Sequence, residues 1–592
     1  MNQPPLTPMS LKAILGRIAH EWETRGRIFD LPSARIWIPD PEIDLSISFL
    51  GRPAASPVGP AAGPHTQMAQ NIVLAWLGGA RVFELKTVQI MDELDIGRPC
   101  IDMETIGYNI EWSQELTVAE SIDEYVKAWM IIEILKRWEP LRDHLGAETG
   151  AYVFDMSVGY DLAGIRSPKV MNFIELMKDA TERIEALRQE IPAPFEEFRN
   201  FDFPTRIADT LTLSTFHGCP PDEIDGIVRH LIDDHQLDVI VKLNPTLLGF
   251  DRVAEILHDV LGYDDVTISR AAFDGDLQFD RAVSLITELR EHAAANGRKF
   301  GIKLTNTLVV ENTKGWMPDD PMYLSGPPLH VIASSVLDRL IGALPGVFDL
   351  PGQGGSSPVT FSAGVTKANL ADTIAMGVAP ATMSTDLLKS GGYGRLKPML
   401  KALTTDVAKS GVKTLTEWKD LRSKEAVAAG HRDWVAAHVG AITGDATGLY
   451  SKEGNSKLPR KVDATLQMWG CTACNLCVTV CPNGAFMKVR SPEAIKEEIG
   501  GSRFQYLVMA ELCNECGNCL TFCPEEGDPA MIKPKLFTDV SRFNGAEGQA
   551  FQLTADGSLL TASAAVGWEK ELEVLSAVIA GDQGVAIRAT DI

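Results

Sequence analysis

The chain has 592 residues, of which 45% are hydrophobic and 23% are charged, and this apolar content is enough for a large core with smaller domains beside it. The formal net charge of −24 argues against nucleic acid or an anionic membrane surface as a partner, because both are bound through basic patches. Eight of the ten cysteines fall in two short runs, a usage that does not suit a secreted disulfide framework.

Residues 1–50 form an N-terminal extension with scattered charges and no apolar run of signal-peptide length. No apolar run elsewhere approaches the length needed to span a membrane. We therefore expect a cytoplasmic protein without a membrane partner, and a reducing compartment also suits the many thiols.

Residues 51–400 alternate short β-branched runs with longer amphipathic stretches. Strand and helix in alternation predict a parallel sheet, and eight such units close a (β/α)₈ TIM barrel of the α/β class. Nine runs are candidates for the eight barrel strands: "SPVGPAAG", "RVFELKTV", "YVFDMSVG", "TLTLSTF", "DVIVKLN", "DVTISR", "KFGIKLT", "PVTFSAG" and "APATMSTD". We place "DVTISR", residues 265–270, outside the barrel.

The carboxyl ends of the strands should carry the chemistry of such a barrel. Gly364 follows the seventh strand, and Ser384 and Thr385 follow the eighth, where backbone N–H groups and hydroxyls commonly hold a phosphate. In "PAAGP", Ala62 and Gly63 offer small residues against which a flat ring can lie.

Lysines end two of the strands, Lys86 in "ELKTV" and Lys242 in "VKLNP". A lysine beside N1 and O2 of a flavin stabilises the reduced anion, although for either lysine taken alone a solvated or salt-bridged side chain is the favoured explanation. Together with Thr87 and the small and hydroxyl residues above, they predict a site for FMN.

Beyond the barrel, residues 401–465 read as a polar helical linker and residues 534–592 as a tail that carries little information. Residues 466–533 contain the pattern CxxCxxCxxxCP twice. Three thiolates on a tight loop hold three corners of a cubane, and the fourth, carried away by a short helix, completes the cluster of the other run.

Two [4Fe–4S] clusters in a small α+β ferredoxin-like domain are therefore expected. The predicted ligands are Cys471, Cys474, Cys477 and Cys523 for cluster 1, and Cys513, Cys516, Cys519 and Cys481 for cluster 2. A pair of zinc sites is the alternative, but tightly spaced all-thiolate runs followed by proline suit iron–sulfur better.

The barrel resembles the dihydroorotate and dihydropyrimidine dehydrogenase family through "AAG", "KTV", "VKLNP", "KLTNT", "SGPPL" and "SAGV", which occur in that family's order over about residues 56–420. A closer resemblance, through "PVGPAAGPHTQMAQNI", "ELKTVQI", "STFHGCPP" and "VKLNPTLLGF", is to the selenate reductase family of bacterial oxidoreductases. The resemblance implies an iron–sulfur flavoprotein in which electrons cross the clusters to FMN and reduce a C=C or C=N bond of a purine- or pyrimidine-like heterocycle.

The same resemblance implies four substrate-binding residues, Asn109 and Glu111 in "YNIEWS" and Asn306 and Thr307 in "LTNT". Side-chain amides offer both a donor and an acceptor, so two asparagines can hold the alternating N–H and C=O edge of a lactam. Asparagine at a strand end is equally common in turns.

Cys219 resembles the acid/base cysteine of the dehydrogenases, which also precedes a proline at the end of the fourth strand. It stands at the start of a predicted helix, where a thiolate is stabilised; a buried inert cysteine is the alternative. His217 is a second candidate proton donor, or a hydrogen-bonded core histidine. Phe216 departs from the family, which has asparagine there, and Cys100 matches no motif and is expected in the core.

No GxGxxG follows a strand anywhere in the chain, so no dinucleotide site is predicted. Members of the closer family carry a nicotinamide- and FAD-binding segment like the small subunit of glutamate synthase. We expect a separate flavoprotein subunit of that kind, or a ferredoxin, as electron partner in a hetero-oligomer. Reduction of selenate or another oxyanion, and a non-catalytic electron-transfer subunit, are the alternative functions.

Overall fold

The computed structural model describes the whole chain except residues 1–5, 93, 95, 111–113, 147–148, 216, 316, 320, 445–447, 545, 547–549, 554–558, 562–568 and 582–592. Its centre is a parallel sheet of eight strands in the order β5-β16-β15-β12-β11-β10-β9-β6. The strands are β5 (Val58–Pro60), β6 (Val82–Glu84), β9 (Val153–Val158), β10 (Thr210–Ser214), β11 (Asp238–Leu243), β12 (Phe300–Leu304), β15 (Val359–Phe361) and β16 (Ala381–Met383). Each corresponds to one of the nine runs, which confirms the predicted barrel.

The barrel nearly closes between its first two strands. The amide of Arg81 donates to the carbonyl of Val58 at 3.0 Å. A Cβ at Gly59 would lie 1.6 Å from the carbonyl oxygen of Val82, so only glycine allows β5 to approach β6 this closely.

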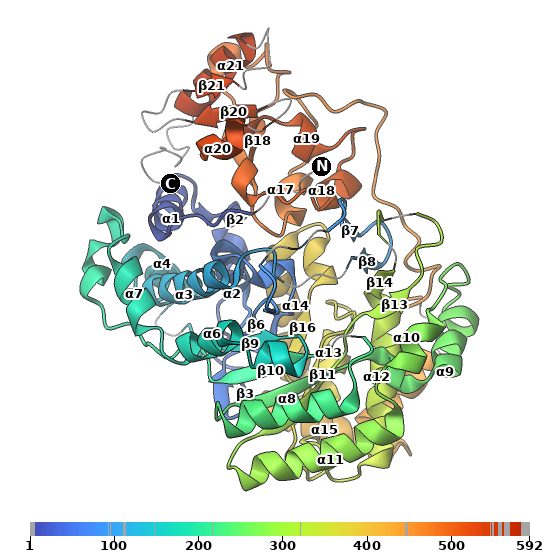
Figure 1. The fold of residues 1–592 in the computed structure, drawn as a ribbon. Helices are drawn as coiled ribbons and strands as arrows, with labels where there is room; N and C mark the ends of the chain where they lie inside the picture. Colours follow the sequence, from blue (N-terminus) through green and yellow to red (C-terminus); the bar gives the residue numbers. More distant parts are fainter. Residues whose placement is uncertain are drawn as a thin grey trace.

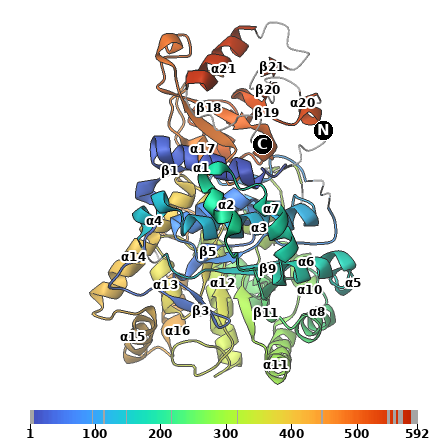
Figure 2. The same cartoon turned by 90° about the vertical axis from the view of Figure 1, so that its left-hand side faces the viewer.

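Helices surround the barrel (Figures 1 and 2), and strands such as β9 and β11 are buried along their whole length because both faces of the sheet are covered. The surrounding helices are α2 (Ala69–Gly78), α3 (Val118–Leu135), α4 (Glu139–Leu145), α5 (Leu162–Ile165), α6 (Pro168–Lys178), α7 (Thr181–Arg188), α8 (Pro221–Asp233), α9 (Phe250–Ala254), α10 (Arg270–Gly275), α11 (Phe279–Ala295), α12 (Pro327–Ala343), α13 (Leu370–Ala375) and α14 (Leu396–Lys409). Within the described part of the chain, no helix is long and apolar enough to cross a membrane.

A second, four-stranded sheet is built from the loops that follow β6 and β12, and it therefore lies at the carboxyl ends of the barrel strands. Its order is β13-β14-β8-β7, with β7 (Ile101–Asp102), β8 (Gly107–Asn109), β13 (Leu308–Val310) and β14 (Met322–Ser325). Ile268 of the "DVTISR" run makes a single antiparallel bridge to Val310 of this sheet, which confirms that this run lies outside the barrel.

The chain outside the barrel packs at its two ends. The N-terminal part holds α1 (Leu11–Arg25), β1 (Arg27–Ile28), β2 (Leu31–Pro32), β3 (Ile47–Phe49) and β4 (Arg52–Ala54), and α14 is followed by α15 (Leu415–Ala428) and α16 (Trp434–Thr443). In Figures 1 and 2, α1 and the β1–β2 hairpin lie between the barrel and the C-terminal domain, whereas α15 lies at the opposite end of the molecule.

The C-terminal domain is a five-stranded sheet in the order β17-β18-β19-β20-β21 with short helices around it. Its elements are α17 (Leu476–Val480), β17 (Phe486–Arg490), β18 (Phe504–Met509), α18 (Asn518–Phe522), α19 (Pro529–Ile532), β19 (Lys535–Phe537), α20 (Val540–Asn544), β20 (Ala550–Leu553), β21 (Leu559–Thr561) and α21 (Glu569–Gly581). The tail after residue 534 thus supplies three of the five strands, and Val574, Leu575 and Val578 of α21 join the same hydrophobic core as β17 and β18.

Candidate active site and cluster ligands

A cavity of about 610 Å³ opens at the carboxyl ends of the barrel strands. All the sequence-predicted cofactor residues and three of the four substrate residues line it: Ala62, Gly63, Lys86, Thr87, Asn109, Lys242, Asn306, Thr307, Gly364, Ser384 and Thr385. The fourth substrate residue, Glu111, lies outside the described residues, as does Phe216. The volume lies in the range typical of cofactor sites.

One end of the cavity is a cradle of small and hydroxyl residues. Gly364 has a φ of 55°, and a Cβ there would lie 2.2 Å from the carbonyl oxygen of Gly326, so the two loops meet only because Gly364 has no side chain. The hydroxyls of Ser325 and Thr385 are 2.9 Å apart, and Ser384 adds another to the same wall. Such a cradle fits a phosphate group.

Two lysines share one buried carboxylate at the floor of the cavity. Glu84 binds the Nζ of Lys303 and lies 3.7 Å from the Nζ of Lys242, and its Oε2 accepts the amide of Ala62 at 3.0 Å. Burial opposes the charge of Glu84, but the two lysines outweigh it and lower its pKa to about 2. Burial also raises the pKa of Asp155 to about 7 and lowers the pKa of Lys303 from its usual value. By formal charge, the two lysines outnumber the one carboxylate of Glu84.

Asp276 holds the loop that carries His217 in place through hydrogen bonds. Sequence reasoning missed this residue, because "FDGDLQ" around it matches no motif. Its carboxylate accepts hydrogen bonds from His217 Nδ1 (2.8 Å), Gly218 N (2.7 Å), Asn244 Nδ2 (3.1 Å) and Thr246 Oγ1 (2.7 Å). Burial would raise the pKa of Asp276, but the bond from His217 and the other donors hold it below its usual value. The other ring nitrogen of His217 lies 3.3 Å from the carbonyl oxygen of Thr307, a residue of the cavity wall.

Cys219 precedes α8, which begins at Pro221 and buries the expected apolar stripe. Burial, followed by the negative charges of Glu223 and Asp276, raises the pKa of the thiol to about 12. This direction is opposite to the one expected from a helix N-terminus, because burial, together with the nearby carboxylates, outweighs the helix dipole. Neither Cys219 nor His217 is among the residues that line the cavity.

The side-chain amides of Asn109 and Asn306 already make hydrogen bonds within the protein, which limits what they can offer to a substrate. Asn306 Nδ2 donates to the carbonyl of Thr215 at 2.8 Å and to Asn244 Oδ1 at 2.7 Å, so both of its donors are used and its Oδ1 keeps acceptor capacity. Asn109 Nδ2 donates to the carbonyl of the next residue at 3.1 Å. A substrate would meet mainly an acceptor at Asn306.

The eight clustered cysteines form two groups in the C-terminal domain. Each of the helices α17 and α18 ends directly before the fourth cysteine of its run. One small cavity is lined by Cys471, Cys474, Cys477 and Cys523. Burial raises the pKa of Cys519, and the neighbouring charges of Asp528, Cys516, Cys513 and Cys481 raise it further, which places the second group together.

In the described residues, no three His, Cys, Asp or Glu side chains converge on one ion position.

The loop of the second group of cysteines touches the wall of the barrel cavity directly. The carbonyl of Cys516 accepts the amides of Cys100 at 3.1 Å and Ile101 at 3.0 Å. Asn518 Nδ2 donates to the carbonyl of Leu388 at 2.9 Å. Because Ile101 and Leu388 both line the cavity, short through-bond paths join the two sites.

A buried ion pair, which no motif indicated, reinforces this contact. Arg98 Nη2 lies 2.5 Å from Glu115 Oε2, and Asn514 of the second cysteine run donates to both oxygens of Glu115 at 2.9 and 3.1 Å. Arg98 also donates to the sulfur of Cys100, which is fully buried as expected. The pair fixes the cysteine loop against the barrel.

An eight-stranded α/β barrel joined to a domain with two four-cysteine runs defines an iron–sulfur oxidoreductase. A family model described as "Oxidoreductase YgfK, N-terminal TIM-barrel domain" matches residues 29–432, and one described as "4Fe-4S dicluster domain" matches residues 470–527. The first match spans more than half of the chain, and the chain belongs to the YgfK oxidoreductase family.

The oxidoreductase YgfK of Escherichia coli K12 is 38% identical over 431 residues, which make up 67% of this chain and 39% of that protein. The protein from Escherichia coli O157:H7 gives the same values. The chain thus spans about two-fifths of the length of these curated relatives. A solved structure of DHODH in complex with ferulenol from Eimeria tenella is 14% identical with a TM-score of 0.40, covering 65% of this chain and 91% of that one, a likeness that establishes neither ligand nor activity.

Proposed function

We propose that the barrel cavity binds FMN and that the protein passes electrons between two [4Fe–4S] clusters and a C=C or C=N bond of a purine- or pyrimidine-like heterocycle, in the manner of dihydropyrimidine dehydrogenase. One observation carries the proposal: a phosphate cradle, a positively charged floor and the loop of a cysteine cluster meet around one cavity. Bound FMN would supply the conversion between hydride transfer and single-electron transfer.

The residues at the strand ends have separate roles in holding the cofactor. Gly364, Ser384 and Thr385 would hold the phosphate, and Ala62 and Gly63 would let the flat ring approach the backbone. Lys86 and Lys242 would face the ring, where positive charge held out of water stabilises the anionic reduced form.

The proton would come from the loop that precedes α8. The thiol of Cys219, with its pKa near 12, stays protonated at neutral pH and holds a proton for the substrate. His217 is the alternative donor, oriented by Asp276. Asn109, Asn306 and Thr307 would position the heterocycle, together with Glu111.

Electrons would reach the clusters from a separate subunit that binds NAD(P)H and FAD, like the small subunit of glutamate synthase, or from a ferredoxin. The absence of a GxGxxG motif after any strand of this sequence supports a partner in a hetero-oligomer. Cys474 is exposed, so the first group of cysteines lies close to the surface where a partner would dock.

A second candidate is reduction of selenate or another oxyanion, as the selenate reductase resemblance suggests. The observation that favours it is the excess positive charge of Lys242 and Lys303 over Glu84, which suits any anionic ligand.

The first test is made on protein purified without oxygen: flavin is released with acid and identified, and iron and sulfide are counted on the same sample. We expect about one FMN and about eight irons per chain. Iron without flavin would contradict the FMN site and favour a non-catalytic electron-transfer subunit.

A second test separates the proton donors and the substrates. Heterocycles and selenate are offered to the reduced protein, and the Cys219→Ala and His217→Asn variants are compared. The variant that lacks the donor should lose turnover while its flavin is still reduced at the normal rate; full turnover in both would contradict both assignments.

A further inference from the structure

A second cavity, of about 690 Å³, lies where the N-terminal hairpin, the barrel and the C-terminal domain meet. Its wall carries six cationic and two acidic side chains, namely Arg25, Arg27, Arg35, Lys367, Arg395, Lys488, Asp30 and Asp386. The wall therefore has an excess of four positive charges in a protein whose net charge is −24.

The two acids of the wall are already engaged. Arg27 Nη1 lies 2.6 Å from Asp30 Oδ1, and Arg395 donates to both oxygens of Asp386 at 2.8 and 2.6 Å. Within the described chain, Arg35 forms no ion pair, and the Nε of Arg27 is buried without a hydrogen-bond partner. Donors and charge thus remain for an anionic ligand.

Another part of the wall is apolar and aromatic. Leu31, Leu74, Met399 and Val478 line it together with Tyr393. Ligand cavities of this size, lined by apolar residues with a few charged groups, take molecules of nucleotide size. We propose that this cavity is a binding site for a phosphorylated small molecule of nucleotide size, with its phosphates on the arginines and lysines and its ring on the apolar wall.

The site is separate from the flavin cavity but adjoins it. Asp386 lines both cavities and directly follows Ser384 and Thr385 of the phosphate cradle. Cys481, a predicted cluster ligand, lines the second cavity as well. The two lysines of the flavin floor do not belong to this wall, so the two sites can be tested independently.

The test uses anaerobically purified protein saturated with FMN, into which ADP, AMP, pyrophosphate and adenosine are titrated by calorimetry. We expect saturable binding of ADP, tighter than that of pyrophosphate or adenosine. The double variant Arg35→Gln, Lys367→Gln should bind ADP roughly tenfold more weakly or worse, because two charge-assisted contacts are lost. Both residues are exposed, so the fold should tolerate the changes.

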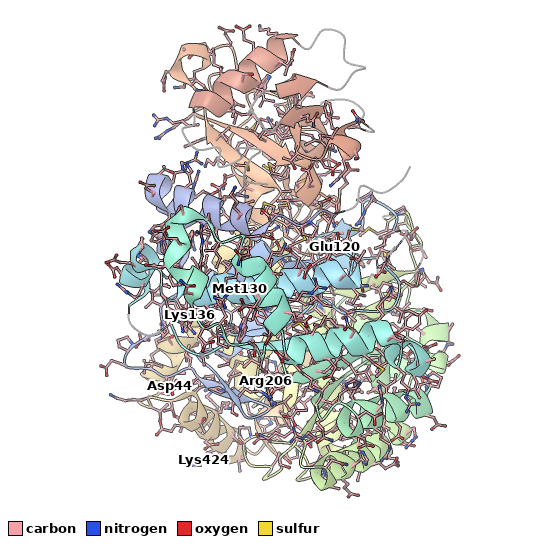
Figure 3. All side chains as sticks on the ribbon, turned by 60° about the vertical axis from the view of Figure 1, so that its left-hand side comes forward. Asp44, Glu120, Met130, Lys136, Arg206 and Lys424 are labelled. Carbon is pink, nitrogen blue, oxygen red and sulfur yellow. The ribbon has the colours of Figure 1, made fainter. Side chains whose placement is uncertain are left out.

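The matched control is the double variant Arg206→Gln, Lys424→Gln, which changes the net charge equally. Both side chains are labelled in Figure 3 on the part of the molecule away from the C-terminal domain, and this variant should bind ADP like the parent protein. No saturable ADP binding, equal affinity for ADP and pyrophosphate, or equal weakening in both double variants would overturn the proposal.

Discussion

Glu84 is the residue on which the charge of the active-site floor depends. Its side chain is 2% exposed and is shared by Lys242 and Lys303. A buried carboxylate with two cationic neighbours is stable only as the anion, which explains its low pKa. Removing it would leave two buried ammonium groups without a partner.

We therefore expect Glu84→Gln to destabilise the barrel by about 3–5 kcal/mol, measured as a lower midpoint of its calorimetric transition. The pKa of Glu84 is lowered from 4.5 to about 2, so its contribution is complete above pH 4.5 and is lost as the pH falls toward 2. The stability of the Glu84→Gln variant should therefore fall less than that of the parent protein as the pH is lowered from 4.5 toward 2. Glu291→Gln, at an exposed position, is the control, and equal stability of the two variants would contradict the role of Glu84.

Gly364 is the second residue whose identity the structure requires. Gly364→Ala should strongly reduce the flavin content of the purified protein, because its Cβ would collide with the carbonyl of Gly326. Gly297 has a similar φ of 67° with nothing within 4 Å of an added Cβ, so Gly297→Ala imposes the backbone strain without the collision and should keep its flavin. Loss of flavin in both variants would assign the effect to backbone strain alone.

At the scale of elements, α17 and α18 matter because each carries the last cysteine of its run away from the first three. The resulting groups bring Cys523 to the first run and Cys481 to the second. The two helices lie against each other, and Asn518 at the start of α18 donates to the carbonyl of Val480 at the end of α17. The exchange of cysteines thus follows from helix packing.

Because the last cysteine of each run completes the cluster of the other run, a variant at that cysteine should lose the same cluster as a variant in the other run. Cys523→Ser should lose the same cluster as Cys471→Ser, and Cys481→Ser the same cluster as Cys513→Ser, with about four irons remaining in each case. Iron counts and EPR spectra of the reduced proteins would show this, with Cys219→Ser as the control that keeps all its iron. Loss of the same cluster in Cys523→Ser and Cys513→Ser would contradict this assignment of ligands.

Much of the fold follows from the sequence because parallel strands buried on both faces read as apolar runs of recognisable length. The cavity residues follow because strand ends in a barrel meet at one edge. Glu84 and Asp276 could not be predicted in their roles, since each acts through contacts with residues distant in sequence, such as Lys303 and His217. The strands of the tail were missed because they are short and complete a sheet begun elsewhere.

At the scale of the whole molecule, the barrel and the C-terminal domain have separate hydrophobic cores. The second core includes ligand cysteines of both runs and the tail helix α21. Its stability should therefore depend on the metal, because bound clusters contribute directly to folding.

Removal of iron with a chelator should lower the unfolding temperature of the C-terminal domain while leaving the barrel transition nearly unchanged. Differential scanning calorimetry of the iron-loaded and iron-free proteins would resolve the two transitions. A single transition that shifts as a whole would show instead that the two cores unfold together.

The N-terminal segment contacts the C-terminal domain, with a consequence for biosynthesis. Thr7 donates its amide to the carbonyl of Glu511 at 2.9 Å, and Arg542 donates to the hydroxyl of Thr7 across 535 positions of sequence. Because N-terminal segments leave the ribosome first, α1 has no C-terminal domain to pack on until that domain has been synthesised. With the exchanged cysteines, cluster 2 has its full ligand set only once Cys519 has emerged, and cluster 1 only once Cys523 has emerged. We expect both clusters to be loaded after the barrel has been synthesised.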